Sequence, residues 1–302
     1  MSNSWLVKKM LSRFSRTELG VGMALITVAM WTIWITSTRF AMRGVEPLDP
    51  VMLAFIRFGT ATLVLAPFWW PLRGIPRNCS PLICIGLLFA GLPYQFLVLW
   101  GLKEAPASEA GPLLTGSLPF FVILISLVIG ERISRARLIG VALISLGVMA
   151  ITGSSLLSTE QGHWRGHLII LGAALSWSIY TIAFRRSGLS ALQAAACVSL
   201  WSTVFLLPLG ANRIVSQVRD IPLTVLLEQI LVQGLIAGVL SLLAYTTAVK
   251  YLGPPRATAI TALTPATATI ASIFVLHEVP GVIEVGGTLL LICGVLVASG
   301  LL

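Results

Sequence analysis

Aromatic residues recur at matched places inside long apolar stretches of the sequence, and they are the side chains best suited to hold a small molecule. Trp31 and Trp34 share one face of an expected helix, and Trp177 and Tyr180 do so further along the chain. Apolar walls with a few polar groups are the usual composition of a small-molecule site. We therefore expect these four to line a substrate cavity; bundle packing is the alternative. Seven further residues are expected there: Tyr94, Gln95, Trp100, Ser117, Ser241, Tyr245 and Thr264.

Arg57 is the one charged residue clearly inside an apolar stretch, about seven residues into the stretch 50–70. A buried guanidinium can anchor a substrate carboxylate or form a gating ion pair. The alternative is a side chain that extends to the lipid headgroups or bonds helix-end carbonyls. No arginine matches it in the second half, where Ser202 and Thr203 stand.

Three prolines fall within apolar stretches: Pro93, Pro119 and Pro265. Each removes a backbone donor and can kink its helix. Hydroxyl residues cluster near the last two, and freed carbonyls together with hydroxyls suit the ammonium of a zwitterion. We expect these prolines to act as hinges or gates, with a static kink as the alternative.

Groups that would do covalent chemistry are missing from the sequence. We find no mid-membrane pair of carboxylates, no metal-ligand spacing and no Ser/His/Asp arrangement, so we expect neither an enzyme, a metal nor a cofactor. His163 and His167 lack a third ligand and are interpreted as a solvated helix start. The first apolar stretch has no acidic residue, and Glu228 is the only candidate near any stretch. This favours facilitated or exchange transport over proton antiport by a membrane carboxylate.

The elements that carry these residues follow from composition. The chain has 302 residues, of which 57% are hydrophobic and 10% charged, whereas a soluble domain has about 25% charged residues. A soluble protein is excluded, and runs of ~20 apolar residues predict membrane helices rather than the short alternating strands of a barrel. The predicted fold is all-α, with ten spans at 19–41, 50–70, 80–101, 107–129, 135–153, 165–184, 190–210, 222–249, 255–276 and 281–302.

The formal net charge of +9 predicts the orientation of these spans. With the N-terminus inside, the inside segments hold 13 of the 20 Lys and Arg residues and the outside segments hold 6. Cytoplasmic loops carry an excess of Lys and Arg, so both termini are expected in the cytoplasm. In so apolar a chain the basic loops face anionic lipid, and we expect no nucleic acid partner.

The chain repeats itself at an offset of 146 or 147 residues. Because five is odd, a duplicated five-span unit must enter the membrane from the opposite side, which gives two inverted repeats around a central cavity. The expected division is an N-terminal segment 1–18, a first repeat 19–153, a connecting loop 154–164 and a second repeat 165–302. The matched residues include Trp31 with Trp177, Lys103 with Lys250, Pro119 with Pro265, and Glu131, Gly140 and Gly147 with Glu278, Gly287 and Gly294.

A family resemblance rests on short motifs that occur in both halves. The first half has the run 101–107 (GLKEAPA), then Leu118-Pro119 and Gly130-Glu131-Arg132; the second has 248–251 (AVKY), Thr264-Pro265 and His277-Glu278. This pattern resembles the EamA unit of the drug/metabolite transporter superfamily over nearly the whole chain. The resemblance implies a ten-helix metabolite exporter of a bacterial inner membrane, most similar to exporters of amino acids, including aromatic ones.

The sequence thus predicts a secondary transporter that exports amino acids by alternating access. Export of drugs or cationic toxic compounds is the alternative, and a membrane enzyme acting on lipids is the alternative from another class. Glu131 and Glu278 are interpreted as helix-end anchors, with Arg135 as the partner of Glu131. The paired glycines permit close helix packing, within a monomer or in a weak dimer.

Overall fold

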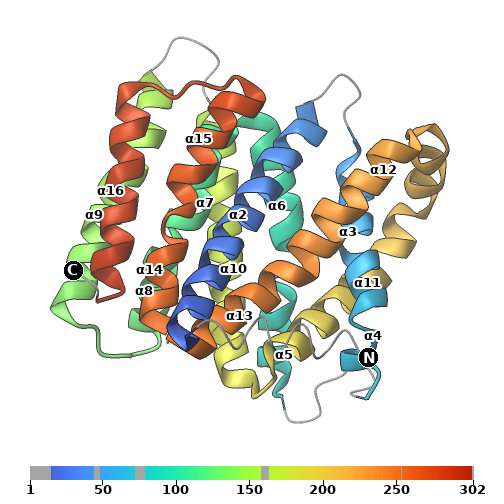
Figure 1. The fold of residues 1–302 in the computed structure, drawn as a ribbon, viewed down its shortest axis with the longest axis horizontal. Coiled ribbons are helices and arrows are strands. Elements are labelled where there is room, and N and C mark those ends of the chain that lie inside the picture. Colours follow the sequence, from blue (N-terminus) through green and yellow to red (C-terminus); the bar gives the residue numbers. More distant parts are fainter. Residues whose placement is uncertain (1–14, 44–47, 72–78, 158–162, 253, 301–302) are drawn as a thin grey trace.

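The computed structural model describes residues 15–43, 48–71, 79–157, 163–252 and 254–300. Most of the expected N-terminal segment 1–18 and the middle of the expected loop 154–164 lie outside the described residues. The described part of the chain contains helices and no strand (Figure 1).

Helices of the first half follow the expected stretches, but several stretches are divided in two. The long helix α2 (Arg16–Arg43) is followed by α3 (Pro50–Val64) with the short α4 (Ala66–Trp69), α5 (Pro81–Leu88) with α6 (Leu92–Glu104), α7 (Ala107–Gly116) with α8 (Leu118–Val128), and α9 (Arg135–Leu157).

The second half has the same order of elements. It comprises α10 (Trp164–Ser187), α11 (Ala191–Asp220), α12 (Leu223–Gln229), the π-helix η1 (Ile230–Leu240), α13 (Ser241–Leu252), α14 (Pro254–Thr261), α15 (Thr264–Leu276) and α16 (Val282–Ala298). In both halves the fourth stretch is divided: α7 and α8 in the first, α14 and α15 in the second.

The divisions between helical segments explain the positions of the three prolines. Pro93, Pro119 and Pro265 are each the second residue of a new helical segment, in α6, α8 and α15. A proline at this position leaves no donor unsatisfied, because the first N–H groups of a helix have no partner within it. The expected kinks inside continuous helices are therefore complete breaks, and each proline begins the segment after a break.

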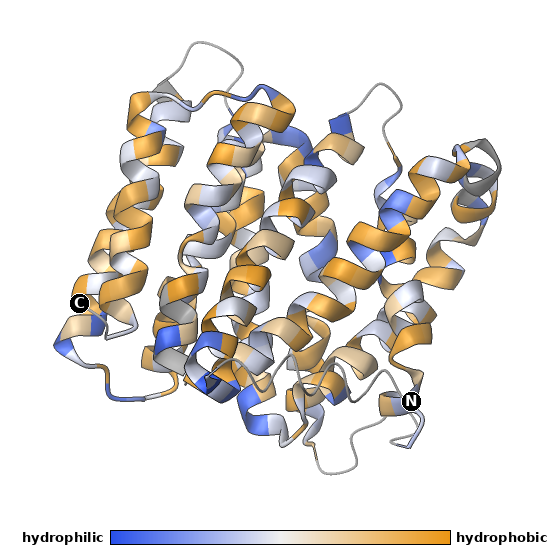
Figure 2. Cartoon of the chain, viewed as in Figure 1, coloured by the Kyte–Doolittle hydropathy of each residue, from blue (hydrophilic) through white to orange (hydrophobic). Residues whose placement is uncertain are grey.

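Seven helical stretches in the described residues are long and apolar enough to cross a membrane, and α3, α15 and α16 are apolar but shorter. Large apolar side chains face outward along their length, among them Leu63, Leu82, Phe274 and Val282. Figure 2 shows hydrophobic residues covering the helices, while hydrophilic ones gather at the two ends of the bundle. Because soluble monomers rarely expose so much contiguous apolar surface, the chain is a multi-pass membrane protein.

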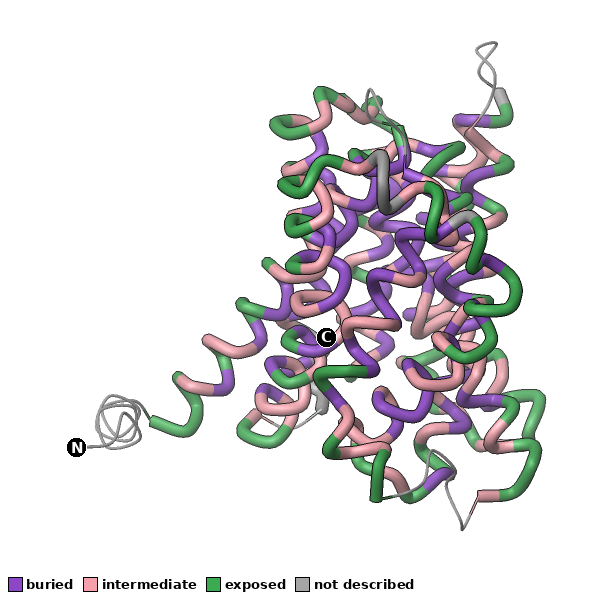
Figure 3. Tube along the Cα trace, turned by 90° about the vertical axis from the view of Figure 1, so that its right-hand side faces the viewer, coloured by how far each residue is buried: buried purple, intermediate pink, exposed green. Residues whose placement is uncertain are grey.

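The two halves pack on each other through their first and third stretches. α2 of the first half lies against α13, and α10 of the second lies against α6. α2 begins at the lower edge of Figure 1 and rises, whereas α10 begins at the upper edge and descends. Figure 3 shows buried residues in the interior of the bundle and exposed ones on its outer turns and at its ends. The centre of the molecule is therefore where α2, α6, α10 and η1 approach one another.

A glycine seam joins α9 to α16. A Cβ built on Gly147 would lie 2.7 Å from the carbonyl oxygen of Gly287, and one on Gly294 would lie 2.9 Å from that of Gly140. No side chain fits at such distances from backbone. The paired glycines of the sequence thus allow two helices of one chain to touch.

Candidate functional site

Trp34 is the centre of the candidate site because three other elements hold or contact its ring. The indole Nε1 donates to Oε1 of Gln233 on η1 at 2.9 Å, and Nε2 of Gln233 donates to Oγ1 of Thr38 at 2.8 Å. Thr38 also donates to the main-chain oxygen of Trp34 at 2.6 Å. Trp34 is 5% exposed and Gln233 fully buried. The indole plane is therefore fixed by a closed set of hydrogen bonds.

Arg57 lies over this indole. Its Cζ is 4.8 Å from the ring centroid of Trp34, which is cation–π geometry. The side chain comes from α3, and the whole residue is 9% exposed. Sequence reasoning placed it inside the bundle or at the headgroups, and the structure places it inside.

The charge of Arg57 is not neutralised. Within the described residues no Asp or Glu pairs with it, and its Nη1 is buried without a hydrogen-bond partner. A cation–π contact contributes about 0.5–2 kcal/mol, whereas removing an ion from water costs several kcal/mol even after relaxation. The described residues therefore leave this buried guanidinium without an anionic partner.

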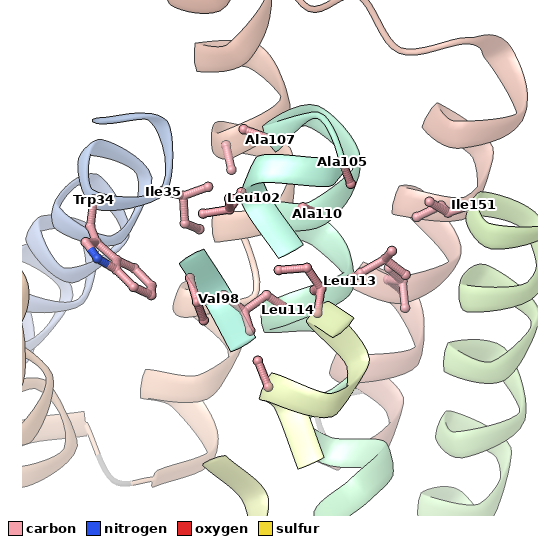
Figure 4. Packing of buried hydrophobic residues seen from close by; sticks show 14 of the residues in the cluster. Trp34, Ile35, Val98, Leu102, Ala105, Ala107, Ala110, Leu113, Leu114 and Ile151 are labelled. Atoms are coloured by element: carbon pink, nitrogen blue, oxygen red, sulfur yellow. The ribbon is translucent and has the colours of Figure 1, made fainter. Parts of the chain in front are cut away.

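A line of aromatic rings continues from Trp34 into the second half of the chain. Ring centroids are 6.3 Å apart for Trp34 and Tyr94, 4.8 Å for Tyr94 and Trp177, and 5.2 Å for Trp177 and Tyr180. Figure 4 shows Trp34 extending from α2 toward α6, where Val98 lies. α2, α6 and α10 thus bring four of the expected cavity residues together beside Arg57.

Four buried side-chain atoms on α6, α12 and α15 have no hydrogen-bond partner in the described residues. Gln95, next to Tyr94 on α6, is fully buried, and both polar atoms of its amide lack a partner. Oγ1 of Thr264 at the start of α15 and Oε1 of Gln229 on α12 are also buried and unpartnered. Buried polar groups are nearly always hydrogen-bonded, so these atoms offer bonding capacity to a guest molecule.

Other expected cavity residues are placed differently. Trp31 pairs with Tyr245 on α13, with centroids 5.8 Å apart. The hydroxyls of Ser117 and Ser241 donate to carbonyl oxygens four residues back in the chain, those of Leu113 and Ala237. Each hydroxyl therefore has a local partner in this structure.

Trp100 does not join the aromatic line. It is 49% exposed, and its ring stacks on Phe96 with centroids 5.5 Å apart. The expectation that it lines the cavity is not supported by this placement. An apolar helix gives little indication of which of its sides faces inward, so the residue type alone does not place Trp100 in the cavity.

The rings pack against one another instead of around an open space. Tyr94 is 6% and Tyr180 9% exposed, and the two best-formed hollows lie elsewhere, one at the start of α9 beside the end of α16 and one around Trp69 and Trp70. The described residues contain no group of three or more His, Cys, Asp or Glu that could hold a metal ion. The arrangement combines an unpaired guanidinium with a wall of aromatic rings.

Glu109 lies close to two histidines, a contact that the sequence did not predict. Oε2 of Glu109 on α7 lies 2.8 Å from Nε2 of His167 and 3.5 Å from Nδ1 of His163. His167 is fully buried, so the interpretation of both histidines as a solvated helix start is wrong for His167. Glu109 is the third residue of the apolar stretch 107–129, and it was not among the expected membrane carboxylates.

Ion pairs tie the ends of the bundle. Nε of Arg39 donates to Oε1 of Glu278 at 2.7 Å. Glu131 lies nearest Arg186, at 3.9 Å from its Nη2, and not Arg135, the expected partner. The repeat relates Glu131 to Glu278 at 147 residues but takes Arg39 to Arg185 at 146, so it does not identify Arg186 as the partner of Glu131.

Comparison with known proteins identifies the family of this chain. The model of the EamA-like transporter family matches residues 18–153 and again residues 164–300. The chain belongs to this family. The resemblance seen in the sequence is thereby confirmed, and the protein is a transporter and not an enzyme.

Curated relatives of this EamA-like transporter are exporters or transporters by name. A probable terminal-alkyne amino-acid exporter from Streptantibioticus cattleyicolor is 28% identical over 91% of this chain and 94% of its own. A probable amino-acid metabolite efflux pump from Escherichia coli is 28% identical over 60% of this chain and 59% of its own. One solved crystal structure covers 92% of this chain and 96% of its own, with a TM-score of 0.57 and 19% identity, which shows a shared fold.

Proposed function

We propose that this protein exports amino acids, aromatic ones among them, by alternating access across a bacterial inner membrane. The observation that carries the proposal is the buried, unneutralised guanidinium of Arg57 on the indole of Trp34. The names of its relatives support amino acids as the substrate class.

In the proposed complex the substrate carboxylate binds Arg57, because a charge-assisted hydrogen bond gives Nη1 the partner that it lacks. The rings of Tyr94, Trp177 and Tyr180 then form an apolar wall for the substrate side chain. The amide of Gln95 supplies an acceptor for the ammonium group, and the electron-rich faces of the rings stabilise its charge.

In this proposal the two inverted repeats provide the alternating access that transport requires. Ten spans form two inverted five-helix repeats with both termini in the cytoplasm, and the site lies between the repeats. The opposite directions of α2 and α10 (Figure 1) support it, as do the matching breaks before Pro119 and Pro265. These breaks, with the one before Pro93, are the hinges on which segments move to open the site to one side.

Cationic drugs are the rival substrates, and the charge of the site argues against them. A cation placed beside Arg57 would meet a like charge without an intervening carboxylate, and like-charge pairs in a desolvated site are strongly repulsive. We accordingly expect carboxylates to bind and organic cations to be rejected.

Counterflow into proteoliposomes tests the proposal. Vesicles loaded with unlabelled phenylalanine, tryptophan, leucine or alanine are placed in the matching labelled amino acid, with protein-free vesicles as the control. We expect protein-dependent uptake, strongest for the aromatic substrates. No uptake of any amino acid, together with uptake of a labelled quaternary ammonium compound, would show that the rival is correct.

A further inference from the structure

Two ion pairs lie at opposite ends of the molecule, Arg39 with Glu278 and Arg186 with Glu131. The offset of 147 residues relates Glu131 to Glu278, while the offset of 146 that relates Trp31 to Trp177 takes Arg39 to Arg185, the neighbour of Arg186. The end of α2 and the connection from α15 to α16 lie at the upper edge of Figure 1, while the end of α10 and the connection from α8 to α9 lie at the lower edge. Each pair joins the end of a first helix in one repeat to the fourth stretch of the other.

A left-handed residue precedes both carboxylates. His277 and Gly130, which precede Glu278 and Glu131, have φ of 56° and 81°. The turns differ in detail, because the N–H of Glu278 donates to the carbonyl of Ser272, six residues back, at 3.2 Å, and the N–H of Glu131 donates to that of Ser126, five residues back, at 2.8 Å. His277 is the only described residue other than glycine with positive φ, which costs about 1–2 kcal/mol. The left-handed conformation is thus present before Glu278 although histidine does not favour it.

The upper pair is the shorter and the more buried of the two. Arg39 and Glu278 approach to 2.7 Å with side chains 4% and 18% exposed, whereas Arg186 and Glu131 are 3.9 Å apart and 55% and 39% exposed. Arg39 also donates to the carbonyl oxygen of Lys103 at 3.2 Å, and Oε2 of Glu278 accepts from the N–H of Ala107 at 2.7 Å. The upper pair therefore joins α2, α6, α7 and the α15–α16 connection.

The two ends of the molecule differ in one backbone hydrogen-bond donor. The position equivalent to Ala107 in the second half is Pro254, and proline has no N–H to donate. Glu131 therefore lacks the backbone bond that Glu278 makes. If the lower pair closes, it closes with one hydrogen bond fewer.

We propose that Arg39–Glu278 and Arg186–Glu131 are alternating latches, each closed when the other is open, and that the missing N–H at Pro254 favours the state with the upper latch closed. The proposal rests on the alternating access described above. A buried ion pair that loses one partner is strongly destabilised, while an exposed pair contributes little. Breaking each pair should therefore shift the two states in opposite directions.

Spin-label distances in the full-length protein test this without any substrate. In a background with the four cysteines replaced, one protein carries labels at Arg43→Cys and Val282→Cys to report the upper end. A second carries Arg185→Cys and Arg135→Cys for the lower end. All four residues are exposed and outside the latches. In the parent we expect a short upper distance and a broad lower one.

Glu278→Gln is expected to lower the ratio of upper-closed to upper-open molecules at least tenfold and to shorten the lower distance. Arg39→Lys, which keeps the charge and loses the planar fork, should do the same to a smaller extent if Glu278→Gln folds poorly. Glu131→Gln is the matched control, and when added to Glu278→Gln it should bring the ratio back toward that of the parent.

Unchanged distances in both Glu278→Gln and Arg39→Lys would overturn the proposal. So would a double variant whose upper end opens further than that of Glu278→Gln alone, because two static anchors would add in the same direction. Opposite shifts without amino-acid counterflow would leave the latches standing and remove the proposed substrate.

Discussion

Gln233 supports the binding site through Trp34, and a double-mutant cycle measures how strongly. Gln233→Met keeps the size of the side chain and removes both of its hydrogen bonds. The indole Nε1, which donates to Oε1 of Gln233 at 2.9 Å in the parent, then stays buried without an acceptor. An unsatisfied buried donor costs about 1–3 kcal/mol. Thr38 keeps its bond to the main-chain oxygen of Trp34, so its hydroxyl adds little to this cost.

We therefore expect Gln233→Met to lower the free energy of unfolding by about 1–3 kcal/mol. Trp34→Phe removes the donor and should rescue part of that loss, because two apolar partners leave nothing unsatisfied. The expected coupling between the two sites is about 1–2 kcal/mol. Unfolding by SDS in mixed micelles, followed by circular dichroism, measures all four corners of the cycle. Additive effects would refute the reasoning, since they would mean that the bond does not fix the indole.

Two further predictions concern packing and the aromatic line. Gly147→Ala should destabilise the fold by about 1–3 kcal/mol, because its Cβ would meet the carbonyl of Gly287 at 2.7 Å. Gly153→Ala on the same helix, where a Cβ meets nothing within 4 Å, should stabilise the fold by up to about 1 kcal/mol in the same unfolding assay, and equal losses would contradict the seam. Trp177→Ala should weaken phenylalanine binding about tenfold through lost ring contacts, whereas Trp100→Ala, on the exposed surface, should leave it unchanged; the reverse order would disprove the placement of the aromatic line.

Much of the architecture was predictable because a membrane imposes simple rules on composition. The apolar stretches follow from the length of a bilayer. The missing N–H of proline predicted a disturbance at Pro93, Pro119 and Pro265, but as kinks and not as the breaks that the structure has. Repetition identified the matches of Trp31 with Trp177 and of Trp34 with Tyr180, and it also identified the paired glycines that form the seam.

Side-chain partners were harder to predict. Trp100 was assigned to the cavity because its helix is apolar on all sides and gives no amphipathic signal for its inner face. Gln233, a single amide in the apolar run 230–240, was visible in the sequence, but the π-helix that carries it was not. The pairing of Glu131 with Arg186 depends on which helices meet at each end, which the local sequence does not encode.

The central claim is that Arg57 binds the carboxylate of the substrate, and one binding measurement tests it most directly. The affinities of phenylalanine and of phenylalanine amide, which lacks the carboxylate, are compared for the parent protein and for Arg57→Met. We predict that the parent prefers phenylalanine at least tenfold, about 1.4 kcal/mol, and that Arg57→Met binds the two equally. A preference that survives in a folded Arg57→Met protein would contradict the claim.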